Sequence, residues 1–179
     1  GDLDLLTFDV SGTSVEWHRN LSHDRTGSPA GWEFEVATGC WGRFEESYDA
    51  VNNVADVALG LGPCNDKPLG KMSHTGGQVQ VLHLNGDGRW DALVSDAGLP
   101  DLIALYNRSD AGLDSMVSRE RFFPQAQPVN LPAMPAAFPL KVDGLDVLAI
   151  APNEPGTQDA DNVWLYARND AWEWNLLND

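Results

Sequence analysis

The sequence has few basic residues. Lysine and arginine number 11 against 27 aspartates and glutamates, which leaves a formal net charge of −16 at neutral pH. A surface of that charge repels the phosphate backbone of nucleic acids and anionic lipid headgroups. We therefore expect neither a nucleic-acid partner nor binding to a membrane surface.

Long apolar runs are also missing. No stretch of about 18 apolar residues could cross a bilayer as a helix, so we expect no membrane insertion. The first residues lack the charged-then-apolar layout of a signal peptide. The hydrophobic content of 42% is still enough to build a buried core, and we expect one domain or part of one.

Familiar catalytic motifs are absent as well. The sequence contains no HExxH, GxSxG, P-loop or GxGxxG pattern. None of the four histidines has a serine or cysteine beside it in a recognisable catalytic arrangement, which favours surface or turn positions for them. Paired carboxylates can cleave glycosidic bonds, but among 27 acidic residues such pairs arise by chance. The sequence assigns no catalytic residue.

Only two cysteines are present, Cys40 and Cys64. In a secreted protein we would expect a disulfide between them, which chain-entropy reasoning values at roughly 3 kcal/mol. In a cytosolic protein they would be free thiols, and their number alone does not decide between the two. Metal ligation is disfavoured because the CxxC spacing is missing.

What the sequence does contain is a unit that occurs three times. Each copy has an Asp followed by an apolar run, then a second apolar run that ends in a polar cluster, then a third run. The first runs are residues 4–9, 91–96 and 146–153; the second are 15–20, 103–109 and 163–169; the third are 32–36, 121–123 and 172–177. The spacing from Asp4 to Asn20 equals that from Asp91 to Asn107.

These runs predict β-strands. They are short, rich in Val, Leu, Trp, Tyr and Phe, and bounded by Gly, Asp, Asn and Pro, and no helical stripe of substantial length occurs. With the alternating run at 78–84, each unit has the size of a propeller blade, an antiparallel meander of about four strands. Trp17, Trp41 and Tyr106 could stack on sugars, but packing between blades is favoured.

We therefore expect an all-β chain whose parts belong to one propeller domain. The expected parts are a first unit at 1–39 that is truncated at its start, an insertion loop at 40–77, a second unit at 78–132 and a third at 133–179. The proline-rich stretch 133–140 should be an irregular crossover, since proline is excluded from central strands.

The stretch "HLNGDGRWD" at 83–91 carries a more specific signal. It places Asn85, Asp87 and Asp91 at loop positions three, five and nine, with glycines at four and six. Alternate polar residues of a tight loop point inward together, as in an EF-hand, but an EF-hand needs Glu at position twelve, where Val94 stands. The stretch resembles instead the calcium loops of FG-GAP or VCBS repeats, which join the first two strands of blades in integrin-like β-propellers.

The resemblance extends over most of the chain. Residues 1–22, 40–46, 83–107 and 138–169 are similar to the long FG-GAP-repeat proteins that Bacteroidetes export by the type IX system. This implies a secreted or cell-surface β-propeller. Because propellers close with about four to eight blades, three units imply a fragment whose remaining blades lie in the same longer chain, and association of copies is the alternative.

The resemblance also implies a calcium ion in the second unit. Its ligands would be Asn85, Asp87, Asp91 and the carbonyl of Arg89. His83 stands at position one, where the family has Asp, and a neutral imidazole is a poor ligand for calcium. The alternative is a turn without metal, in which Asp91 accepts backbone N–H bonds.

The other two units offer weaker metal candidates. Asp2 and Asp4 are the tail of a first-unit loop whose head is missing. Asp143 and Asp146 belong to a shortened third loop, for which we expect a hairpin without metal.

We expect a non-catalytic scaffold or recognition module, with adhesion as one such role, which presents loops to a protein or glycan. One alternative is a propeller-fold polysaccharide lyase or glycoside hydrolase, which would gather carboxylates, Arg, His or Tyr at one channel mouth. Another is a passive spacer in a larger exported protein.

Overall fold

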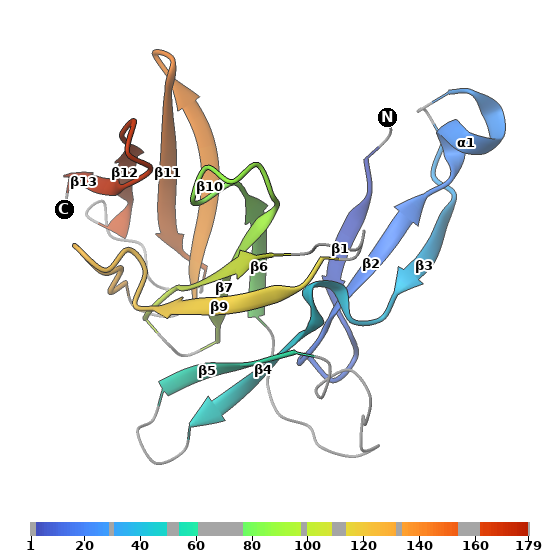
Figure 1. The fold of residues 1–179 in the computed structure, drawn as a ribbon, viewed down its shortest axis with the longest axis horizontal. Helices are drawn as coiled ribbons and strands as arrows, with labels where there is room; N and C mark the ends of the chain where they lie inside the picture. The colour runs from blue at the N-terminus through green and yellow to red at the C-terminus, as the bar shows by residue number, and fades with distance from the viewer. Residues whose placement is uncertain are drawn as a thin grey trace.

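The computed structural model describes residues 3–28, 31–49, 54–60, 77–97, 100–108, 114–131, 134–153 and 162–178. This part of the chain is all-β, with 54% strand and 7% helix. Its strands form four antiparallel sheets, and none of these sheets closes on itself within the described residues (Figure 1). The predicted all-β class is confirmed.

The first sheet has three strands in chain order. These are β1 (Leu5–Phe8), β2 (Val15–Asn20) and β3 (Phe34–Thr38). The short helix α1 (Ser22–Thr26) follows β2 and ends at Gly27, whose φ of 70° is readily adopted by glycine. In the described part of the chain, no helix is long and apolar enough to cross a membrane.

The segment that we expected to be an insertion loop, 40–77, is partly regular. It contains the short 3₁₀ turn η1 (Trp41–Arg43) and a two-stranded hairpin sheet of β4 (Phe44–Asp49) and β5 (Val54–Leu59). Phe44 and Val57 are buried almost completely, so this hairpin adds to the core. Cys64 lies outside the described residues, and its pairing with Cys40 stays a prediction.

The central sheet is a four-stranded meander. Its strands are β6 (Gly77–Leu82), β7 (Asp91–Asp96), β8 (Ile103–Asn107) and β9 (Met116–Arg121). The third run of this unit, expected at 121–123, was placed too late. Phe122 has a φ of 60°, which is foreign to a strand, so the chain leaves the sheet there.

The C-terminal sheet is a second four-stranded meander. Its strands are β10 (Pro135–Val142), β11 (Leu145–Pro152), β12 (Trp164–Arg168) and β13 (Trp174–Asn178).

The stretch 133–140 is therefore largely strand, and the expected irregular crossover is wrong. β10 is the edge strand of its sheet, so the backbone N–H groups on its outer side donate to no neighbouring strand of that sheet. Pro135 and Pro139 are an even number of residues apart, so both ring nitrogens face the same side of the strand. An edge strand accommodates the prolines that a central strand would reject.

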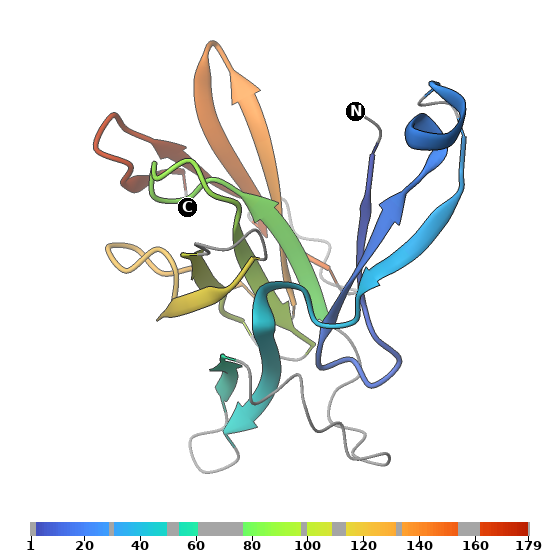
Figure 2. The same cartoon turned by 45° about the vertical axis from the view of Figure 1, so that its right-hand side comes forward.

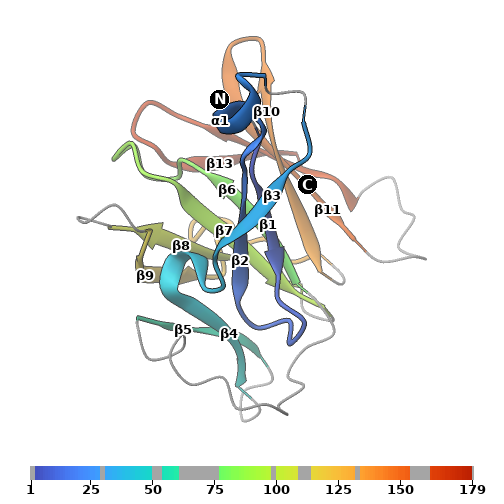
Figure 3. The ribbon, with the colours of Figure 1, turned by 90° about the vertical axis from the view of Figure 1, so that its right-hand side faces the viewer.

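The central sheet is buried on both faces. All six residues of β7 are buried, and its apolar residues Ala92, Leu93 and Val94 alternate between two apolar clusters as the period of a strand requires. Leu93 and Ala104 pack toward the C-terminal sheet. Val94 and Ile103 pack toward the hairpin sheet and Val15 of the first sheet. Figures 2 and 3 show the central sheet between these neighbours.

Candidate functional site

The loop that joins β6 to β7 is built from side chains that bind its own backbone. Asn85 Oδ1 accepts the N–H of Asp87 at 3.1 Å, and Asp87 Oδ1 accepts the N–H of Arg89 at 2.9 Å. Gly86 and Gly88 both have a φ of 78°, which glycine adopts without strain. Asn85 and Asp87 are thus brought together, in two successive Asx turns on an exposed loop.

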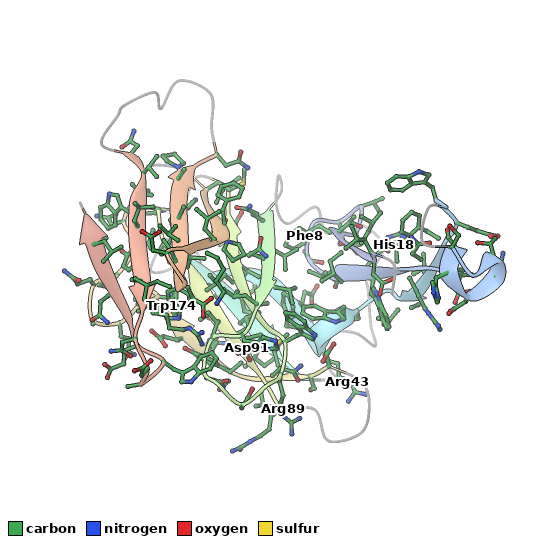
Figure 4. All side chains as sticks on the ribbon, turned by 90° about the horizontal axis from the view of Figure 1, so that it is seen from above. Phe8, His18, Arg43, Arg89, Asp91 and Trp174 are labelled. Carbon is green, nitrogen blue, oxygen red and sulfur yellow. The ribbon has the colours of Figure 1, made fainter. Side chains whose placement is uncertain are left out.

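Asp91 lies deeper than the rest of the loop (Figure 4). Its side chain is fully buried; Oδ2 accepts the N–H of Leu84 at 2.9 Å, and Oδ1 accepts the N–H of Asn107 at 2.9 Å. In return, Asn107 Nδ2 donates to the carbonyl of Trp90 at 3.1 Å. Burial raises the pKa of Asp91, and these backbone hydrogen bonds oppose the shift. Asp91 ties the loop to the end of β8.

His83 and Arg89 face each other across the loop. The His83 Nδ1 atom lies 2.5 Å from the carbonyl oxygen of Arg89, and the imidazole ring stacks on Trp90 with centroids 4.1 Å apart. The carbonyl that the resemblance assigns to calcium is therefore engaged by the imidazole at position one.

The predicted ligand set fits calcium by donor type, since carboxylate, amide and carbonyl oxygens are the ligands this ion takes. In the observed arrangement, however, the oxygens of Asn85, Asp87, Arg89 and Asp91 each meet a donor of this chain. No three Asp, Glu, His or Cys side chains of the described residues are grouped to hold a metal ion by themselves. Calcium binding at this loop stays a prediction.

Asp4 repeats the role of Asp91 in the first sheet. Its Oδ1 accepts the N–H of Asn20 at 2.8 Å, and Asn20 Nδ2 donates to the carbonyl of Leu3 at 3.3 Å. The second carboxylate oxygen accepts the indole N–H of Trp17 at 3.1 Å. The equal spacing of the two Asp–Asn pairs has a structural cause, because each pair joins the start of one strand to the end of the next. Asp2 lies outside the described residues.

The aspartates of the third unit make contacts different from those of Asp4 and Asp91. Asp146 pairs with Lys141, 2.6 Å away, and with Arg168. Asp143 and Gly144, with φ values of 50° and 85°, form the tight turn between β10 and β11, as expected for an Asp-Gly hairpin of type I′. Asp143 acts as a turn residue and Asp146 as a partner in ion pairs.

A cleft that the sequence did not predict lies between the central and C-terminal sheets. It has a volume of about 960 Å³. Aromatic side chains from both sheets line it, together with acids and amides; the main ones are Tyr106, Glu120, Gln125, Trp172, Glu173 and Trp174. A cavity of this size is typical of small-molecule sites.

Hydrogen bonds within the protein hold the polar groups of the cleft. Glu120 accepts the hydroxyl of Tyr106 at 2.6 Å and the backbone N–H of Gln125 at 2.8 Å. Burial, with the bond to Glu120, raises the pKa of Tyr106 above its ordinary range. Trp174 is 6% exposed, and its indole N–H has no acceptor among the described residues. The nitrogen itself is buried from solvent.

Trp172 forms the rim of the cleft. The guanidinium of Arg168 lies 3.5 Å from the centre of the indole ring, a close cation–π contact. On the other side, a Cβ added at Gly86 would stand 2.3 Å from the ring. The turn between β12 and β13 therefore touches the loop between β6 and β7. Of the residues that line this cleft, the sequence had singled out Tyr106 as one that could stack on sugars, and the alternation Trp-Glu-Trp-Asn at 172–175 predicted a strand alone.

No protein-family model matches the chain, and neither the curated proteins nor the solved structures compared with it gave a match. The relation to FG-GAP repeats therefore stays a prediction from the sequence.

Proposed function

We propose that this chain is a section of a secreted or cell-surface β-propeller, that it acts as a non-catalytic recognition module, and that it binds a glycan in the cleft between its central and C-terminal sheets. The observation that carries the proposal is the lining of the cleft, where Tyr106, Trp172 and Trp174 stand among carboxylates and amides. Aromatic faces pack on the apolar faces of sugars, and the polar groups can bind their hydroxyls.

The stacking of the sheets supports the propeller. Two four-stranded meanders lie face to face in chain order, and the central one is covered on both faces. The outer hairpin of the C-terminal sheet also leaves large apolar side chains exposed, with Phe138 at 49%, Leu140 at 46% and Val142 at 47%. Such a patch is typical of a surface that another layer covers, which fits further blades in a longer chain.

Binding is favoured over hydrolysis by how the acids of the cleft are used. Three acids line the cleft. Both oxygens of Glu120 are held by protein donors, Glu173 accepts a hydrogen bond from Asn169 at 2.9 Å, and Asp87 accepts the backbone N–H of Arg89 at 2.9 Å. Groups fixed in this way can orient a ligand, whereas a hydrolase needs one carboxyl to carry a proton and a second to act as base or nucleophile. A passive spacer would need no cleft of this size with an aromatic lining.

The test is a titration of the purified chain with a panel of neutral and acidic oligosaccharides, followed by calorimetry. We expect at least one glycan to bind and Trp172→Ala to weaken its binding about tenfold, equivalent to about 1.4 kcal/mol. Trp32→Ala is the matched control, because Trp32 is 86% exposed and does not line the cleft. If Trp172→Ala folds poorly, Tyr106→Phe, which removes only the hydroxyl, replaces it as the variant whose glycan binding is measured.

Two outcomes would refute the proposal. One is that no glycan of the panel binds the wild-type chain. The other is that Trp32→Ala weakens binding as much as Trp172→Ala does, which would place the ligand elsewhere.

A further inference from the structure

We propose that Asn85 is a site of spontaneous covalent modification, at which the folded chain converts the asparagine, through a cyclic succinimide, into aspartate and isoaspartate. The backbone nitrogen of Gly86 is the nucleophile, and water is the only co-reactant. The proposal depends neither on the proposed glycan site nor on calcium.

The residue that follows Asn85 leaves the nucleophile open. Asn85 is the one asparagine of the sequence that precedes a glycine. A side chain on the following residue would shield its backbone nitrogen and crowd a five-membered ring, and glycine has none. Both residues are exposed, and within the described part of the chain the N–H of Gly86 donates to no other group. Water and hydroxide therefore reach the peptide bond between them.

The side chain of Asn85 is held where the reaction needs it. Its Oδ1 accepts the N–H of Asp87 at 3.1 Å, so the side chain folds back along the peptide that links Asn85 to Gly86. The hydrogen bond closes a ring of atoms that contains both the Asn85 Cγ carbon and the Gly86 nitrogen. It also stabilises the negative charge that develops on Oδ1 when a nucleophile adds to Cγ.

The first step forms the succinimide. Hydroxide removes the proton of the Gly86 nitrogen, and that nitrogen bonds to Cγ of Asn85. The bond from Cγ to Nδ2 breaks, and the amide nitrogen leaves as ammonia after it takes a proton from water, which regenerates the hydroxide.

The second step opens the ring with one water molecule. Addition of water at Cγ gives aspartate, and addition at the backbone carbonyl carbon gives isoaspartate, in which the main chain runs through the former side chain. In both products an NH₂ group has been replaced by OH, so the mass rises by about one dalton.

A second asparagine of the chain provides a comparison. Asn169, between β12 and β13, is also exposed, and its Oδ1 accepts the N–H of Ala171 at 2.9 Å in the same kind of turn. The residue after it is Asp170, whose side chain crowds the ring. The negative charge of that side chain also disfavours removal of a proton from the adjacent nitrogen. We therefore expect Asn169 to persist while Asn85 is converted.

Conversion changes the wall of the cleft. Asn85 lines the cleft, so either product adds a carboxylate there. Isoaspartate also lengthens the backbone just before Gly86, where an added Cβ would stand 2.3 Å from the Trp172 ring. The isoaspartate form therefore has to move the loop away from Trp172, whereas the aspartate form keeps the length of the loop.

The experiment follows the modification in the purified chain. The chain is incubated at 37 °C with a chelator, at pH 6 and at pH 8, and samples are digested at acidic pH and mapped by mass spectrometry. A parallel incubation in urea reports the unfolded chain. Gly86→Ala is made in a Trp172→Ala background, where the indole that an added Cβ would meet is gone, and Trp172→Ala alone is its matched control.

We expect the heavier form to accumulate at Asn85 at least about tenfold faster than at Asn169 in the folded chain. It should accumulate faster at pH 8 than at pH 6, because the deprotonated nitrogen is the nucleophile. Gly86→Ala should slow conversion at Asn85 about tenfold relative to Trp172→Ala. The proposal is overturned if Asn85 converts no faster than Asn169, if it converts in urea but not in the folded chain, or if Gly86→Ala leaves the rate unchanged.

Discussion

The carboxylate of Asp91 and the backbone N–H of Asn107, 2.9 Å apart, join the first residue of β7 to the last residue of β8. Asp4 and Asn20 make the same bond in the first sheet at 2.8 Å. In both pairs the asparagine side chain returns a hydrogen bond to the carbonyl that precedes the aspartate. The recurrence of this paired bond explains the recurring sequence spacing without any metal ion.

Replacing Asp91 should destabilise the chain strongly. Asp91→Asn keeps the size of the side chain but turns one acceptor into an NH₂ donor that faces a backbone N–H. We expect the free energy of unfolding to fall by about 2 to 4 kcal/mol, measured by urea denaturation. Asp87→Asn, at an exposed position of the same loop, should cost less than about 1 kcal/mol. Equal losses would show that Asp91 has no special structural role.

The contact between Gly86 and Trp172 can be tested with a matched pair of glycines. Gly86 and Gly88 share a φ of 78°, but an added Cβ meets the Trp172 ring only at Gly86 and nothing within 4 Å at Gly88. Gly88→Ala should therefore cost about 1 to 2 kcal/mol from backbone strain alone. Gly86→Ala should cost about 1 to 3 kcal/mol more, because the indole must move.

The readout for these glycine variants is chemical denaturation together with tryptophan fluorescence. Gly86→Ala should also shift the emission spectrum, since Trp172 lines the open cleft. If both variants lose the same stability and keep the wild-type spectrum, the loop and the β12–β13 turn are not in contact in solution.

Glu46, a buried residue of β4, predicts how the stability of the chain depends on pH. Its pKa is about 9 in the folded chain, against an ordinary value of 4.5. The folded state therefore holds the proton more tightly, and the stabilisation is complete below pH 4.5 and is lost as pH rises toward 9. At pH 7 this loss amounts to about 3 kcal/mol.

The measurement is the difference in unfolding free energy between Glu46→Gln and the wild type, followed from pH 5 to pH 8. The unfolding free energy of Glu46→Gln relative to the wild type should rise steadily over that range, because glutamine has no carboxyl proton to lose. Glu45→Gln should run parallel to the wild type. If the difference in unfolding free energy between Glu46→Gln and the wild type does not change with pH, the Glu46 carboxyl is solvated in the folded chain.

Calcium at the loop of the second unit remains testable on its own. If Asn85, Asp87 and Asp91 bind the ion, Asp87→Asn should abolish the rise in melting temperature that millimolar calcium gives the wild type. A wild-type melting temperature that is the same in calcium and in chelator would show that the loop binds no calcium. His83→Asp should strengthen binding, because it supplies the carboxylate that the resemblance expects at position one.

The strands that could be predicted from the sequence are those whose burial follows the pattern of apolar residues. β2 and β7 occupy the residues expected for them, 15–20 and 91–96. β9 was missed because Met116 is its only buried residue, and the rest of the strand is exposed or partly exposed and, apart from Val117, polar. The nearby Phe123 is buried, but it reaches the core from a turn.

The candidate sites depend on segments far apart in the chain, which explains why the sequence located only one of them. The loop at 83–91 is local, so its turn residues could be recognised from their spacing. The cleft joins Tyr106 to Trp172, and a small pocket between the hairpin sheet and the central sheet is lined by Glu46, Ser95 and Asp101. An acidic residue on a strand ordinarily predicts a solvent-facing position, and only the packing of the hairpin sheet on the central sheet buries Glu46.

The burial of the central sheet on both faces sets a lower limit on any shortened form of this protein. A piece that keeps the first sheet and the hairpin sheet but omits 77–121 would leave Val15, Phe44 and Val57 facing water, since their cover comes from β7, β8 and β9. A piece that keeps only the C-terminal sheet would expose Leu148 and Tyr166 in the same way. Dissection of the chain for crystallisation or display has to be planned outward from 77–121.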